Sequence, residues 1–203
     1  MAKPGGVFCL EGQWDDDLAH RGSVLPTLEL LERLGAIRFI HRDTATPAEL
    51  KFFVDRWLTA KYAAYQVGFF AIDGSPGRLC LSKPYELDLA EVAELMAGRA
   101  DGKRLYFGTG SVLRASDATL VELLRVSGAS MLCGFTKRID WLESAAFETV
   151  VLNRLANSDK VNGVELLARS PRWAPLAEHL GFRVVYRNGE SRRVPAMRER
   201  AGA

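Results

Sequence analysis

The stretch KRLYFGTGS at residues 103–111 decides how the rest of the chain is arranged. Its first half, residues 105–107, is a short apolar run that predicts a buried strand. Its second half, residues 108–111, is a corner of small residues, where glycine lets the backbone approach a ligand or a neighbouring loop closely. In an open α/β sheet, ligands bind beyond the carboxyl ends of the strands. We therefore expect the functional site at this corner, although the corner contains no strong nucleophile.

Apolar runs typical of further buried strands lie on both sides of this stretch and alternate with helical patterns. The turn signal DGSPG at 73–77, followed by the alternating RLCLS at 78–82, predicts a small antiparallel ribbon after the third strand. The expected strands are 7–10, 37–40, 63–72, 103–107, 130–135 and 183–186. The expected helices are 25–34, 46–58, 89–96, 118–127 and 139–157, with two short helices within 164–180, where two prolines interrupt the pattern.

This alternation predicts an α/β fold, a three-layer sandwich with a mostly parallel six-stranded sheet and the small ribbon after strand three. The second strand, with Arg38 between apolar neighbours, is expected near an edge of the sheet. We expect a single domain over residues 1–188. The arginine-rich residues 189–203 lack an apolar period and are expected to form a flexible tail.

Size and composition narrow the function classes. A chain of 203 residues, 48% hydrophobic and 26% charged, is typical of one soluble globular domain. The net charge of +2 is too small to indicate nucleic-acid binding. The apolar runs fall far short of the ~20 residues that span a bilayer, and no secretory signal is visible at the start. We expect a cytoplasmic protein that binds neither membrane nor nucleic acid.

Two further patterns argue against cofactors and disulfides. The cysteines Cys9, Cys80 and Cys133 are scattered, odd in number and set in apolar runs, which indicates buried free thiols in a reducing compartment. The sequence GTGS at 108–111 lacks the lysine that ends a Walker phosphate-binding loop. We therefore expect no cofactor.

The expected strand ends supply the candidate site residues, because the carboxyl ends of neighbouring parallel strands lie at one edge of the sheet. Glu11 follows the first strand, and Trp14 lies in the loop after it. Asp73 and Gly74 follow the third strand. The remaining candidates are Gly108, Gly110 and Ser111 after the fourth strand, and Thr136 and Asp140 after the fifth.

Three stretches in this order carry a resemblance to a known family: FFAIDGSPG at 69–77 with its ribbon, LYFGTGS at 105–111, and GASMLCGFTKRIDWLESAAFETVVLNRL at 128–155. Together they resemble the caspase-like fold, and most of all the bacterial CHAT-type peptidase domains. The resemblance covers residues 7–155 and rests on order and pattern. It implies a cysteine–histidine dyad, with histidine before the glycine that ends the third strand and cysteine at the end of the fourth.

The chain departs from the family at both dyad positions. Asp73 stands where the family has histidine, and Gly110 stands where it has cysteine. Glycine cannot supply a thiolate, and aspartate is a poor proton shuttle at neutral pH. We therefore expect a catalytically degenerate domain, a pseudo-peptidase that binds a protein or peptide partner. The resemblance also implies that Glu11, with Trp14 stacked beside it, favours a basic group.

Other readings stay open at this point. Ser111 could act as a relocated nucleophile in an active hydrolase, although a serine at a turn or a helix cap is the commoner case. Glu11, Asp73 and Asp140 could together bind a divalent cation. In the pseudo-peptidase reading, Gly74, Gly108, Thr136 and Asp140 line the binding site. Edge strands could also pair two copies of the chain into a homo-oligomer.

Overall fold

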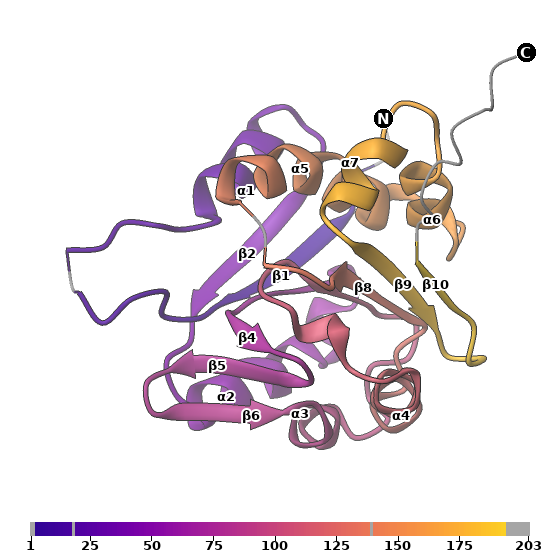
Figure 1. Ribbon diagram of the computed structural model, residues 1–203. Helices are drawn as coiled ribbons and strands as arrows, with labels where there is room; N and C mark the ends of the chain where they lie inside the picture. Colours follow the sequence, from indigo (N-terminus) through magenta and orange to yellow (C-terminus); the bar gives the residue numbers. More distant parts are fainter. Residues whose placement is uncertain (1–2, 18, 139, 194–203) are drawn as a thin grey trace, which may run out of the picture.

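The computed structural model describes residues 3–17, 19–138 and 140–193 of the chain. Within these residues a central sheet has seven strands in the order β10-β9-β8-β7-β3-β1-β2 (Figure 1). The five parallel strands are β1 (Gly6–Glu11), β2 (Arg38–Asp43), β3 (Val67–Ala71), β7 (Arg104–Phe107) and β8 (Met131–Phe135). Strand β9 (Phe182–Tyr186) is antiparallel to β8, and β10 (Ser191–Arg193) is antiparallel to β9.

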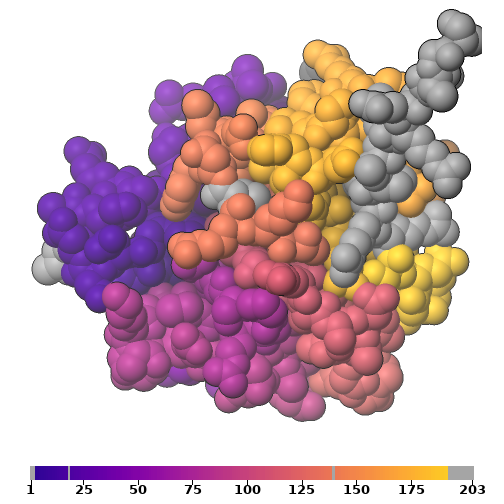
Figure 2. Space-filling model, in the orientation of Figure 1, coloured from indigo at the N-terminus to yellow at the C-terminus, as the bar shows by residue number. Residues whose placement is uncertain are grey.

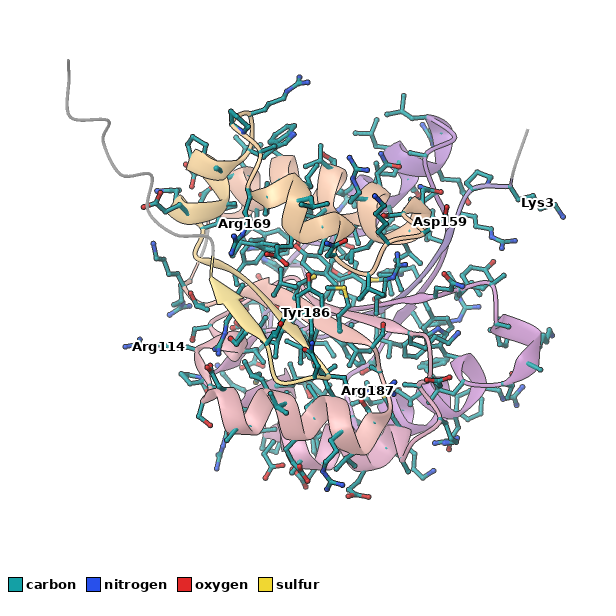
Figure 3. The ribbon with its side chains drawn as sticks, turned by 90° about the vertical axis from the view of Figure 1, so that its right-hand side faces the viewer. Lys3, Arg114, Asp159, Arg169, Tyr186 and Arg187 are labelled. Atoms are coloured by element: carbon teal, nitrogen blue, oxygen red, sulfur yellow. The ribbon has the colours of Figure 1, made fainter. Side chains whose placement is uncertain are left out.

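Helices cover both faces of the sheet, which makes the three-layer α/β architecture predicted from the sequence (Figures 1 and 3). Side chains alternate along each strand, so that Val7 and Cys9 enter one core while Phe8 and Leu10 enter the other. The first core packs against α1 (Leu25–Arg33), α5 (Trp141–Asn157), α6 (Gly163–Ala168) and α7 (Ala174–His179). The second packs against α2 (Pro47–Trp57), α3 (Leu89–Met96) and α4 (Asp117–Ser127).

Local signals explain where the helices begin and end. Thr46 and Glu49 form a capping box at the start of α2, with a proline in the first turn. Ser116 caps α4 at its N-terminus, and Gly128, in the left-handed conformation, ends it. Asp140 accepts hydrogen bonds from the first backbone N–H groups of α5. The helical predictions are therefore confirmed to within a few residues.

The ribbon after the third strand is also confirmed and is larger than predicted. It is a three-stranded antiparallel sheet of β4 (Gly74–Ser75), β5 (Arg78–Ser82) and β6 (Tyr85–Asp88). The third strand itself is shorter than predicted, because residues 63–66 form a turn and an irregular segment after the 3₁₀ helix Ala60–Tyr62, and β3 begins at Val67. The second strand lies at the edge of the main sheet, as its alternating pattern predicts.

The prediction of a flexible tail from residue 189 is wrong for its first part. The backbone N–H of Tyr186 donates to the carbonyl of Glu190, and Gly189 adopts a φ of +86°, which closes a tight turn. The turn returns the chain as β10, so the sheet has one strand more than the six predicted. The rest of the predicted tail, residues 194–203, lies outside the described residues.

Two smaller expectations have mixed outcomes. All three cysteines are free, and Cys9 and Cys133 are buried as predicted, but Cys80 is only partly buried. Over the described residues, no helix has the length and apolar character needed to cross a membrane.

Candidate functional site

A pocket of about 260 Å³ lies at the carboxyl edge of β3 and β7, on the face that α1 and α5 cover. Figure 2 shows this side of the molecule, where orange residues lie between the indigo segment and the magenta ribbon. The pocket is lined by Trp14, His20, Ser23, Val24, Thr27, Asp73, Gly108, Thr109, Gly110, Arg138, Trp141, Ser144, Ala145 and Glu148.

One wall consists of the corner after β7, and this wall brings Asp73 and Gly110 together. The Thr109 hydroxyl donates to the carbonyl of Ile72, which ties the corner to the end of β3. A Cβ atom built on Gly110 would lie 3.0 Å from Oδ1 of Asp73. The same Cβ would lie 2.6 Å from the carbonyl oxygen of Gly74, and Gly110 has a φ of +60°. Position 110 therefore has no room for a side chain unless the backbone shifts.

The floor of the pocket carries a buried carboxyl group that the sequence analysis missed. Glu148, on α5, is 3% exposed, and its Oε1 accepts a hydrogen bond of 3.0 Å from the Tyr106 hydroxyl. Gly108 lets this carboxyl group pack directly against the backbone of the corner, because a Cβ there would lie 2.5 Å from Oε1 of Glu148 and 2.4 Å from the Phe69 ring. Burial raises the pKa of Glu148 to about 8, and the Tyr106 hydrogen bond opposes this shift only in part.

Two tryptophans form the opposite side of the pocket. The rings of Trp14 and Trp141 meet edge to face, with centroids 4.7 Å apart and an interplanar angle of 71°. Trp141, in the first turn of α5, is 47% exposed. Arg138 and His20, both exposed, complete the lining. The pocket thus combines an aromatic side, an acidic wall and an acidic floor.

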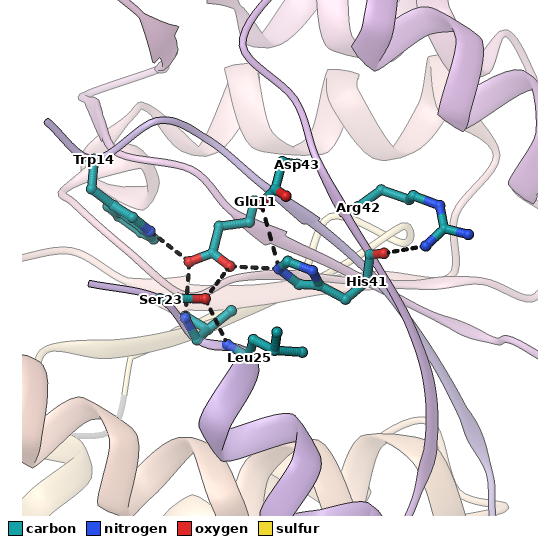
Figure 4. A network of polar contacts seen from close by, with 8 residues as sticks. Glu11, Trp14, Ser23, Leu25, His41, Arg42 and Asp43 are labelled. Atoms are coloured by element: carbon teal, nitrogen blue, oxygen red, sulfur yellow. Dashed lines mark hydrogen bonds and ion pairs between the residues drawn. The ribbon is translucent and has the colours of Figure 1, made fainter. Parts of the chain in front are cut away.

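Glu11 does not line this pocket, contrary to the sequence-based expectation. It is 2% exposed and accepts hydrogen bonds from Trp14 Nε1 (2.5 Å), Ser23 Oγ (2.8 Å) and the backbone N–H of Val24 (2.8 Å), and it pairs with His41 Nε2 (2.5 Å) (Figure 4). Burial opposes ionisation, but these hydrogen bonds outweigh it and lower the pKa of Glu11. Glu11 therefore ties the loop after β1 to β2 and holds Trp14 against the pocket.

The proposed carboxylate cluster of Glu11, Asp73 and Asp140 is not formed. In the described part of the chain, one group of three potential metal ligands lies within 4.8 Å, and it consists of Glu11, His41 and Asp43. Both oxygens of Glu11 already accept hydrogen bonds, and Asp43 is 90% exposed at its side chain. This geometry is that of a hydrogen-bonded ion pair.

Four further predicted site residues lie outside the pocket lining. Gly74 begins β4, Thr136 donates to the carbonyl of Gly181, and Asp140 caps α5. Ser111 precedes the 3₁₀ helix Val112–Arg114, and among the described residues its hydroxyl has no hydrogen-bonded histidine or carboxylate. These residues shape the backbone around the pocket and do not reach into it.

A buried arginine holds the segment after Ser111 in place. Arg183, on β9, donates from Nη1 to the carbonyls of Leu113 (2.7 Å) and Ala115 (3.0 Å). Its guanidinium also pairs with Asp117 at the start of α4. Hydrogen bonds thus hold the corner after β7 on one side to Ile72 and the segment that follows it to β9.

None of the three cysteines lines the pocket, and burial raises the pKa of each thiol. A raised pKa keeps a thiol protonated and unreactive at neutral pH. These thiols therefore do not supply a nucleophile to the pocket.

The helical period of α5 could have revealed Glu148. Its neighbours in the buried positions of the helix are Ser144, Phe147, Val151, Leu152 and Leu155. A glutamate in such a stripe is rarely buried without a partner or a function. Trp141, Ser144 and Arg138 had no comparable signal, because their role depends on how α5 meets the loop after β1.

Comparison with known protein families assigns the chain to one of them. Residues 5–186 match the model of a family described as a family of unknown function (DUF6642), and the chain belongs to this family. No curated protein matches the chain.

Proposed function

We propose that this chain is a caspase-like domain, related to the CHAT-type peptidases, that binds a peptide segment of a partner protein and does not cleave it. One observation supports the proposal: Asp73 and Gly110, which the sequence resemblance matches to the two dyad positions, lie side by side at the edge of a pocket.

The arrangement of strands supports the caspase-like relationship. Five parallel strands are followed by an antiparallel strand, and a small ribbon is inserted directly after β3. The dyad positions follow β3 and β7, which pair directly in the sheet. An order of strands alone does not define a function, so the argument depends on the site.

The chemistry of the site supports binding without cleavage. Position 110 has neither a nucleophile nor space for one, and the cysteines are remote from the pocket. Acyl transfer needs a nucleophile with a base in hydrogen-bond reach. Within the described residues the pocket offers Asp73 and Glu148 as carboxyl groups and His20 as an imidazole, with no cysteine among them.

A peptide-binding screen tests the proposal. The chain is incubated with a library of labelled pentapeptides, binding is read by fluorescence anisotropy, and the peptides are then examined by mass spectrometry. We expect binding without a cleaved bond and no labelling by a cysteine-directed activity probe, with an active CHAT-type peptidase as the positive control.

Two variants locate the binding. Trp141→Ala should weaken it, because Trp141 forms a side of the pocket. Phe52→Ala, at a similarly exposed aromatic residue on α2 on the opposite face, should leave it unchanged. Cleavage that Ser111→Ala or Asp73→Ala abolishes would instead establish the alternative, an active hydrolase.

A further inference from the structure

The proposed absence of peptidase activity does not involve Glu148, the buried carboxyl group at the floor of the pocket. This group therefore calls for a separate explanation. Oε1 of Glu148 accepts the Tyr106 hydroxyl, whereas Oε2 has no hydrogen-bond partner among the described residues. Glu148 is 97% shielded from solvent by the protein and yet lines the pocket. A buried carboxyl with one donor is costly in its charged form, and a ligand that supplies positive charge would remove that cost.

The rest of the lining favours a cation over an anion. Asp73 adds a second carboxylate on the wall formed by the corner after β7. Trp14 and Trp141 present aromatic surface on the opposite side, which attracts ammonium and guanidinium groups. Arg138 is exposed, so its guanidinium can extend into solvent.

The size of the pocket favours one side chain. Its volume, about 260 Å³, is below the roughly 300–1,000 Å³ typical of small-molecule sites. The exposed side chains of Trp141 and Leu142 stand in the first turn of α5, where residues that flank the inserted side chain would pass. This geometry suits a peptide more than a free metabolite.

We propose that the pocket binds a lysine or arginine side chain of a peptide, with Glu148 as its buried counter-ion and Asp73 as a second acidic contact. This inference rests on the proposed function, because it names the class of peptide that the domain binds. It assigns the basic preference to Glu148 and removes it from Glu11, whose carboxylate is already saturated by its own partners.

The inference gives peptide binding a characteristic pH dependence. Glu148 must release its proton to pair with the cation, and its pKa in the free protein is about 8. Affinity should therefore rise by up to about tenfold per pH unit as the pH approaches 8 and then level off. The other titratable or charged groups around Glu148 are Tyr106 on β7, Cys9 and Glu11 on β1, Asp73 after β3, His20 in the loop after β1, and Arg138 before α5.

The test measures binding of three acetylated, amidated pentapeptides, Ala-Ala-X-Ala-Ala with X as Lys, Glu or Gln, by calorimetry between pH 6 and pH 9. We expect the Lys peptide to bind at least tenfold more tightly than the others at pH 8 and to show the predicted rise. Glu148→Gln should abolish both the preference and the rise. His20→Gln should keep the rise, which excludes titration of that imidazole as its source.

A matched control is available on α6. Glu165 is also buried, and its Oε2 accepts the Tyr186 hydroxyl at 2.8 Å, but it lies outside the pocket. Glu165→Gln should leave peptide affinity unchanged. Equal binding of the three peptides would overturn the basic preference and leave the proposed function standing. If none of the three peptides binds, and no library peptide binds either, both the basic preference and the proposed function are overturned.

Discussion

Glu11 and Glu148 are two glutamates with nearly equal burial, 2% and 3% exposed, and opposite ionisation behaviour. Glu11 receives hydrogen bonds from four groups, and its pKa is lowered. Glu148 receives one, and its pKa is raised to about 8. At Glu11 the hydrogen bonds outweigh the effect of burial on the pKa, whereas at Glu148 burial outweighs the single hydrogen bond.

The difference separates a structural group from a functional one. Glu11 is satisfied by its own chain and fixes the loop after β1, with Trp14 in place beside the pocket (Figure 4). Glu148 is left short of donors at the floor of a pocket. A perturbed carboxyl in a pocket is a candidate for a functional site, whereas a saturated one belongs to the framework.

The largest expected effect is at Glu11. Glu11→Ala leaves four hydrogen-bond donors without their acceptor, so we expect a loss of about 4 kcal/mol in the free energy of unfolding at pH 7. Because the folded pKa is lowered, this contribution is present above the unfolded pKa and is lost as the pH falls through the folded one. Urea unfolding at pH 7 and pH 3 measures both effects, and equal losses at the two pH values would contradict the assignment.

Glu148→Gln should act in the opposite direction. The folded pKa is raised, so the wild type loses stability as the pH rises from the unfolded value towards about 8. Across this window the free energy of unfolding of the variant, relative to that of the wild type, should increase by up to about 1.4 kcal/mol per pH unit. Thermal or urea unfolding at pH 5 and pH 8 checks it. A variant that is less stable than the wild type at pH 8 would show that Glu148 is stabilised by groups other than Tyr106.

A smaller effect is expected from Tyr106→Phe, which removes the hydrogen bond to Glu148. The pKa of Glu148 should rise further, because that bond opposes the effect of burial, and stability should fall by about 1 kcal/mol. Carbon-13 NMR titration of labelled glutamate side chains reads the pKa directly. Tyr186→Phe, which removes the matching contact of Glu165, should leave the Glu148 titration unchanged.

The smallest effect is expected from Ser23→Ala, which removes one of the four contacts of Glu11. Three contacts remain, so the pKa of Glu11 should rise only slightly and stability should fall by about 0.5–1 kcal/mol. The same NMR titration compares this change with that at Glu148 in Tyr106→Phe. A larger pKa shift at Glu11 than at Glu148 would contradict the expectation that the loss of one donor matters less where three others remain.

Much of the fold was predictable because it depends on local patterns. Apolar runs, capping residues and turn glycines located the strands, the helices and the ribbon after β3. The added strand β10 was not predictable from its polar sequence, because its pairing is supplied by β9. A short edge strand needs a partner strand more than it needs an apolar pattern of its own.

The candidate site was predictable only in part. Asp73, Gly108, Gly110 and Trp14 were expected at the carboxyl edge of the sheet, and all four line the pocket. Glu11 was expected there as well, but the loop after β1 turns Trp14 and Ser23 back onto it. Thr136 and Asp140 were expected at the site because they follow a strand, but their side chains form hydrogen bonds with backbone groups instead.

The sequence by itself determined the α/β architecture, the position of the corner at 108–111 and the presence of aspartate at position 73 and glycine at position 110, because each follows from residues that are neighbours in the chain. Only the tertiary structure decided that position 110 has no room for a side chain and that Glu148 is the acidic floor of the pocket. Both facts depend on which segments far apart in the chain pack together. Contact between distant segments sets the space, the donors and the solvent around each group, and these control its chemistry.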